Sequence, residues 1–165
     1  AFLPWIQVNS WFAMLHPWYL SPKKKQMYAD YLRTRYDLIP YIYSAALKCA
    51  QFGNPILQSM PLAFPDDRNV DDMVYQYMFG ESLLVGVFSD EIYLPEGGWI
   101  NFWTGEKVIG TGATVKCEVP DNRAGLLFIK DGEVFHQLYR GNNTNEQMYQ
   151  KISDTLTLLA KDGEK

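Results

Sequence analysis

No apolar run in this sequence is long enough to cross a membrane. The 165 residues are 47% hydrophobic and 21% charged, an ordinary globular composition with enough chain to bury a core. A membrane-spanning helix needs roughly 18 or more consecutive apolar residues. Proline, glycine and charged residues interrupt each apolar stretch before it reaches that length. We therefore expect no membrane partner.

Cysteine and histidine are scarce, with two residues of each type. Cys49 and Cys117 lie too far apart for a close-spaced metal motif, and no His-Glu-x-x-His pattern occurs. The two cysteines either pack as small buried residues or pair in a single long-range disulfide. His136 alternates outward on a predicted strand and is expected at the surface. We predict neither a metal site nor a cofactor.

An excess of positive charge is also missing. Fifteen Lys and Arg residues stand against nineteen Asp and Glu residues, for a net charge of −4. Such a chain offers no basic field for nucleic acid, so we expect no nucleic-acid partner. The nucleophile elbow, the Walker loop and the dinucleotide fingerprint are absent as well. Gly110-Thr111-Gly112 lacks their context and predicts a hairpin turn.

Aromatic residues, by contrast, are abundant. They make up 15% of the chain and include five Trp and eleven Tyr. This excess favours carbohydrate or another flat ligand. The first five residues, from Ala1 to Trp5, have no initiator Met and no leader-like pattern, so we interpret them as the interior of a longer protein.

The N-terminal third predicts one long helix. Ser21-Pro22 is a favourable helix start and Gly53 a favourable stop. Pro40 removes one backbone donor, so a kink or break is expected at Leu38-Ile39. The positions that recur at helical spacing and form an apolar stripe are Met27, Tyr31, Leu38, Ile42, Ala46 and Ala50.

After Gly53, short apolar runs separated by proline and glycine predict an antiparallel β-sandwich. A short helix is expected from Asp71 to Tyr77. The tail from Asn142 is expected to form a helix or loop followed by a strand. The predicted strands are Ile56 to Phe64, Ser82 to Phe88, Glu91 to Leu94, Trp99 to Trp103, Thr114 to Val119, Leu126 to Lys130 and Glu133 to Gln137.

The carboxylates do not form a catalytic pattern. A glycosidase needs two of them flanking one bond, about 5 to 10 Å apart. Here the acidic residues stand beside Pro, Asn or Gly, where turn formation and solvation explain them. They occur as Asp66-Asp67, Asp71-Asp72, Asp90-Glu91 and Asp121.

Two aromatic groups have the character of sugar-binding elements. Trp99 and Trp103 fall on one face of a predicted strand, where they either stack on a sugar or close a core. His16 follows an aromatic run and precedes Pro17-Trp18, so its imidazole is either a structural group or a hydrogen-bonding partner for sugar hydroxyls.

Several stretches in series resemble glycoside hydrolase family 31, the α-glucosidase and α-xylosidase group. Trp5-Ile6-Gln7, His16-Pro17-Trp18 and residues 31–44 are similar to the closing segment of that family's catalytic barrel. A second set of stretches is similar to its proximal C-terminal β-domain. This set is Gly53-Asn54-Pro55-Ile56, Phe64-Pro65-Asp66-Asp67, residues 76–85, Tyr93-Leu94-Pro95-Glu96-Gly97-Gly98-Trp99-Ile100 and Phe102-Trp103-Thr104-Gly105.

The resemblance implies an α+β fragment of a retaining glycosidase that hydrolyses α-glucosides or α-xylosides, with an oligosaccharide or glycoside as substrate. Residues 1–53 would end a (β/α)8 barrel, and residues 54–165 would form the proximal C-terminal β-sandwich domain, incomplete at its C-terminus. The family's two catalytic carboxylates lie upstream of the matching region. The resemblance thus implies no catalytic residue in this chain, no activity of the chain alone, and His16 and Trp18 as substrate-binding residues.

Two alternatives to this interpretation remain. The chain could instead be a free-standing carbohydrate-binding module, with either Trp99 and Trp103 or Trp5, Trp11 and Trp18 as stacking platforms. It could also be a catalytically silent scaffold derived from the family. In each case the apolar stripe of the long helix needs a partner, so we expect it to dock on the sheet or to mediate self-association.

Overall fold

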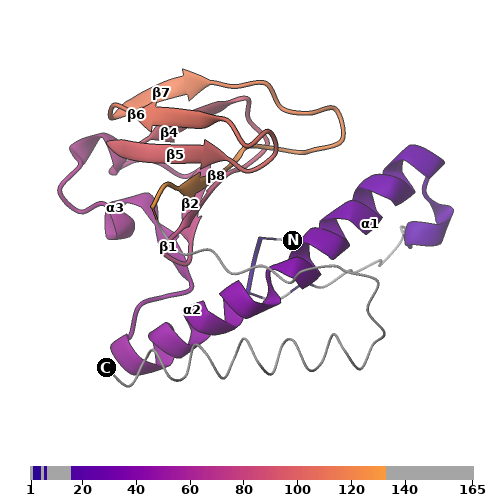
Figure 1. Ribbon diagram of the computed structural model, residues 1–165, viewed down its shortest axis with the longest axis horizontal. Coiled ribbons are helices and arrows are strands. Elements are labelled where there is room, and N and C mark those ends of the chain that lie inside the picture. Colours follow the sequence, from indigo (N-terminus) through magenta and orange to yellow (C-terminus); the bar gives the residue numbers. More distant parts are fainter. Residues whose placement is uncertain (1, 5, 7–15, 133–165) are drawn as a thin grey trace. The chain divides into compact units, whose positions relative to one another are not determined.

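The computed structural model describes residues 2–4, 6 and 16–132 (Figure 1). Several predictions fall outside these residues. They concern Trp5, Trp11, His136, the strand predicted at 133–137 and the tail from Asn142. Within them, residues 3–54 and residues 55–132 form two compact units. No helix in the described ranges is long and apolar enough to span a membrane.

The described part of the first unit contains a short 3-10 helix and two α-helices, where one long helix with a kink or break at Leu38-Ile39 was predicted. They are η1 (Pro17–Tyr19), α1 (Pro22–Asp37) and α2 (Ile39–Phe52). Leu38 separates α1 from α2. Pro40 lies in the first turn of α2, where its missing N–H needs no helical partner, so the second helix begins where the first has ended.

The ends of these helices follow the local sequence. Ser21 occupies the N-cap of α1 in an extended conformation, although its side chain makes no capping hydrogen bond. Gly53 ends α2 at a φ of 78°, in the left-handed region that glycine enters without steric cost. Its N–H donates to the carbonyl oxygen of Cys49 at 2.9 Å. Cys49 and Cys117 are both free and half-buried, so the structure contains no disulfide between them.

The second unit is built from two antiparallel sheets. One has six strands in the order β1-β2-β3-β8-β5-β6, and the other pairs β4 with β7 (Figure 1). The α+β class with antiparallel sheets is therefore confirmed. The strands are β1 (Leu57–Ser59), β2 (Gln76–Phe79), β3 (Leu83–Gly86), β4 (Glu91–Leu94), β5 (Gly97–Asn101), β6 (Lys107–Gly110), β7 (Ala113–Lys116) and β8 (Leu127–Lys130).

One hydrophobic core joins the two sheets. All four residues of β3, the strand between β2 and β8, are buried. Trp99 of β5 is 1% exposed, and its indole Nε1 donates to the Pro95 carbonyl oxygen at 2.9 Å. The core includes Met60, Val70, Met78, Leu84, Ile92, Tyr93, Leu94, Trp99, Leu126 and Phe128.

Two predicted elements of this unit are wrong. The strand expected from Ile56 to Phe64 stops at Ser59, because Pro61 lies in the first turn of a short helix, α3 (Met60–Ala63). No helix forms from Asp71 to Tyr77. A 3-10 helix, η2 (Arg68–Val70), precedes that segment instead. The last two residues of the segment, Gln76 and Tyr77, belong to β2.

Gly110-Thr111-Gly112 does not close a hairpin. It joins β6, which pairs with β5, to β7, which pairs with β4 in the other sheet. Gly110 is required there by close packing, since a Cβ at this position would lie 2.1 Å from the Pro95 carbonyl oxygen. This crossing segment brings Thr111 and Gly112 next to the end of β4.

Candidate functional site

His16 and Trp18 lie together at the start of the helical region. The imidazole of His16 stacks on the indole of Trp18, with ring centroids 4.5 Å apart and planes 10° from parallel. His16 is half-buried and caps η1, while Trp18 is 63% exposed. The stack leaves most of the Trp18 side chain exposed and sets the orientation of the imidazole relative to the indole.

The two tryptophans of the β-unit do not form a platform. Trp99 is buried in the core, and Trp103 follows the end of β5 in a turn. Trp103 is half-buried, donates from Nε1 to the Gly125 carbonyl oxygen at 3.1 Å, and lies 4.6 Å under the Arg123 guanidinium. A buried indole offers no face to a sugar, so the stacking site proposed for this pair loses its basis.

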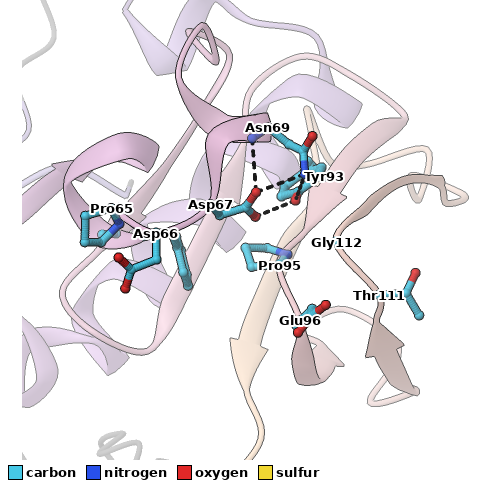
Figure 2. A pocket seen from close by; sticks show the side chains of 11 residues that line it. Pro65, Asp66, Asp67, Asn69, Tyr93, Pro95, Glu96, Thr111 and Gly112 are labelled. Atoms are coloured by element: carbon cyan, nitrogen blue, oxygen red, sulfur yellow. Dashed lines mark hydrogen bonds between the residues drawn. The ribbon is translucent and has the colours of Figure 1, made fainter.

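A pocket of about 510 Å³ opens in the β-unit between three segments that are distant in the sequence (Figure 2). These segments are the loop after α3, the turn between β4 and β5, and the crossing segment between β6 and β7. The lining residues are Ala63, Phe64, Pro65, Asp66, Asp67, Asn69, Tyr93, Pro95, Glu96, Thr111 and Gly112.

Asp67, Asn69 and Tyr93 are joined by hydrogen bonds in one wall of this pocket (Figure 2). The buried Tyr93 hydroxyl donates to Asp67 Oδ2 at 2.5 Å, and Asn69 donates to Asp67 Oδ1 from its backbone N–H at 3.1 Å and from Nδ2 at 3.0 Å. Asn69 Nδ2 also lies 3.3 Å from the Tyr93 oxygen. The donors, the Tyr93 hydroxyl first among them, lower the pKa of Asp67, whereas burial chiefly raises that of Tyr93.

The other acidic residues named in the sequence are engaged locally or solvated. Asp71 pairs with Arg68 at 3.4 Å within one turn, and Asp90 pairs with Lys116 at 3.0 Å across the small sheet. Hydrogen bonding to Lys116 lowers the pKa of Asp90. Among the described residues, no three His, Cys, Asp or Glu side chains are grouped closely enough to hold a metal ion.

Sequence reasoning assigned Asp66 and Asp67 to a turn and did not identify the pocket. Asp67 indeed caps η2 by accepting from the Asn69 N–H. Tyr93, Glu96 and Thr111 gave no signal of a site, since Thr111 is distant in sequence from the other two and only the crossing between the sheets brings the three together. The turn-forming pair Asp66-Asp67 was the one local indication of this region.

Comparison with known proteins identifies relatives. The sequence model described as the glycosyl hydrolase family 31 C-terminal domain matches residues 53–135. An α-xylosidase of Saccharolobus solfataricus is 32% identical over 99% of this chain, and the aligned region is 23% of that protein. The chain therefore spans about a quarter of the length of this curated relative.

Solved structures give the same picture. A family 31 α-xylosidase of Xanthomonas citri matches 81% of this chain with a TM-score of 0.74 and 32% identity, over 16% of its own chain. A family 31 dextranase of Flavobacterium johnsoniae, solved with isomaltotriose, matches 81% of this chain with a TM-score of 0.71 and 26% identity, over 17% of its own chain.

Proposed function

Because the chain belongs to glycoside hydrolase family 31, we propose that it is the C-terminal portion of a retaining glycosidase that hydrolyses α-xylosides or α-glucosides. The observation that carries this proposal is the alignment with an α-xylosidase along 99% of the chain. The substrate of the whole enzyme is accordingly an oligosaccharide or glycoside with an α-linked sugar.

The proposal divides the chain at the end of α2. Residues 1–53 correspond to the end of a (β/α)8 barrel, and residues 54–165 to the proximal C-terminal β-sandwich domain. In support, the family match starts at residue 53 and the second compact unit starts at Pro55. The two sheets of that unit share a core in the manner of a sandwich.

The chain alone is expected to be inactive. Retaining hydrolysis requires a carboxylate nucleophile and, about 5 to 5.5 Å away, a carboxylic acid with a raised pKa. Asp67 and Asp90 instead have lowered pKa values, and each is committed to a structural partner. These groups stay ionised at neutral pH and cannot serve as the proton donor.

The test is an activity assay of the 165-residue chain with aryl α-xylosides and aryl α-glucosides. We expect no turnover above a matched blank. Turnover that disappears when one acidic residue of the chain is replaced would contradict the proposal that this chain contains no catalytic carboxylate. Supplying the upstream part of the enzyme should restore hydrolysis of one of the two substrate types.

We assign His16 and Trp18 to substrate binding in the whole enzyme. They follow the Trp5-x-Gln7 element, and barrel enzymes keep their chemistry at the ends of the strands. The exposed Trp18 ring offers an apolar face to a sugar, and the stacked imidazole of His16 offers a donor or acceptor to a hydroxyl.

The corresponding test is His16→Ala in the whole enzyme. We expect kcat/KM to fall by the equivalent of one hydrogen bond, about 1–3 kcal/mol, with little change in Tm. A fall in Tm with full activity of the remaining folded enzyme would show that His16 is a structural residue.

The helices supply a further proposal, self-association of the isolated chain. None of the sixteen residues of α1 is fully buried, and Tyr36 and Phe52 are 55% and 71% exposed. Apolar surface of this kind favours contact with a second copy. Sedimentation of the chain at rising concentration tests this, and a monomer throughout would overturn it. Docking of the helices on the sheet stays a prediction.

A further inference from the structure

The pocket of the β-unit combines an apolar side with separate polar groups. Phe64 and Pro65 contribute apolar surface, while Asn69 and Thr111 contribute an amide and a hydroxyl. The volume of about 510 Å³ falls within the range of about 300–1,000 Å³ that small-molecule sites occupy. A ligand with one apolar face and polar groups around its edge would match both parts of this lining.

One wall of the pocket is held in place before any ligand arrives. Asp67 accepts three hydrogen bonds, one from the Tyr93 hydroxyl and two from Asn69. Tyr93 is 4% exposed and belongs to the core, so it ties the loop at residues 67–69 to strand β4. A ligand that binds here does not bear the cost of ordering these side chains.

Other polar groups of the lining have no partner in the part of the chain that the structure describes. Asp66, Glu96 and Thr111 are exposed, and their side chains form no hydrogen bond with another described residue. They belong to three different segments, and Figure 2 shows Asp66 apart from Glu96 and Thr111. The acceptors are thus spread around the pocket rather than gathered on one point.

The chemistry of the lining narrows the class of ligand. Its charged side chains are Asp66, Asp67 and Glu96, all negative, which disfavours a phosphate or another anion. No three acidic groups in the described residues are close enough to share a metal ion. Spread acceptors instead suit a molecule that carries several hydroxyl donors.

We propose that this pocket binds the sugar units of a short neutral oligosaccharide. The apolar face of a sugar ring lies against Phe64 and Pro65, and its hydroxyls donate to Glu96 and Asp66. The Thr111 hydroxyl is within the same lining and serves as donor or acceptor. This site goes beyond the proposed function and does not depend on it, because binding here requires no hydrolysis.

The test is a titration of the isotopically labelled 165-residue chain with xylose, glucose, isomaltose and maltose, followed by backbone amide chemical shifts. We expect saturable shifts at residues 64–69, 93–96 and 111–112, strongest for one of the disaccharides. Shifts confined to other residues, or no shift with any of the four sugars, would overturn the proposal. Shifts at the pocket with calcium chloride but with none of the sugars would identify a cation site and also overturn it.

Two matched variants test whether the Glu96 carboxylate contributes to sugar binding. Glu96→Ala removes an exposed acceptor of the pocket, and we expect the Kd for the best sugar to rise about threefold to tenfold, the equivalent of one hydrogen bond. Glu91→Ala removes an exposed glutamate at the other end of β4, outside the pocket, and should leave the Kd unchanged. Equal Kd values for both variants and the parent chain would overturn the assignment. Since the readout is binding without turnover, either result leaves the proposed enzymatic function to its own assay.

Discussion

The Tyr93 hydroxyl and the Asp67 carboxylate form a 2.5 Å hydrogen bond that links strand β4 to the loop before η2. Tyr93 is buried, so the bond fixes the carboxylate at the edge of the core. The shape of the pocket depends on this contact, because it joins two segments of one wall that are 26 residues apart in the sequence.

Replacing Tyr93 with Phe should weaken the dependence of stability on acid pH. The hydroxyl is the main cause of the lowered pKa of Asp67. A carboxylate with a lowered folded-state pKa contributes stability above its unfolded value of 3.8, and that contribution is lost as the pH falls through the folded-state pKa. Without the donor, the folded and unfolded values approach each other.

The measurement is the free energy of unfolding in urea at several pH values between about pH 5 and pH 2. We expect a shallower decline for Tyr93→Phe than for the parent chain. The control is Tyr75→Phe, since Tyr75 is 75% exposed and makes no hydrogen bond with its side chain to a described residue. An equally steep decline in both variants would contradict the role assigned to Tyr93.

Replacing Gly110 with Ala should destabilise the fold by about 1–3 kcal/mol, the usual cost of overpacking. The new Cβ would lie 2.1 Å from the Pro95 carbonyl oxygen and 2.9 Å from the Trp99 ring, so backbone as well as side chain must move. Urea unfolding measures the loss. Thr111→Ala, at the next and exposed position, is the control and should unfold at nearly the parent midpoint.

Trp99→Ala should cost about 3–5 kcal/mol, as expected for truncation of a large buried aromatic side chain. The substitution also leaves the Pro95 carbonyl oxygen without its indole donor. Trp18→Ala removes the same side chain from a position that is 63% exposed, and should change the free energy of unfolding by no more than about 0.5 kcal/mol. Similar losses for both variants would contradict the assignment of Trp99 to the core.

The ion pair between Asp90 and Lys116 should be visible in titration more than in stability. Their 3.0 Å contact lowers the pKa of Asp90, but the two side chains are 53% and 71% exposed. Exposed pairs contribute little to folding. We expect Lys116→Gln to raise the pKa of Asp90 toward 3.8 and to leave Tm almost unchanged. The ¹³C chemical shift of the Asp90 carboxyl group, measured against pH, gives this pKa. An unchanged Asp90 titration would show that the contact is absent in solution.

The sequence was most informative where proline or polar turn residues stand on both sides of an apolar run. Strand β4 has the bounds that were predicted, Glu91 to Leu94, because Pro95 ends it and a polar turn precedes it. Strand β6 was missed, since Lys107–Gly110 is an edge strand with one buried residue and too little apolar character to be distinguished from a loop. Strand β2 was not predicted, because a helix was expected from Asp71 to Tyr77, which overlaps the first two residues of the strand.

The pocket could not have been predicted from any one motif. Asp67 was recognised as a turn residue, which it is, but its contact with Tyr93 depends on how β4 packs beside the loop. Thr111 enters the lining because its segment crosses from one sheet to the other. Local sequence specifies turns and caps well, whereas this site arises from tertiary packing.

The position of β8 sets when the β-unit can be completed during synthesis. This strand lies between β3 and β5, with Leu84 opposite Phe128 and Ile100 opposite Ile129. Until residues 127–130 leave the ribosome, no strand connects β1-β2-β3 with β5-β6 by hydrogen bonds. The apolar faces of these two groups of strands then do not belong to one sheet. The unit therefore cannot acquire its native core one strand at a time, and a nascent chain that stops before residue 127 holds two incomplete half-sheets with exposed edges open to aggregation.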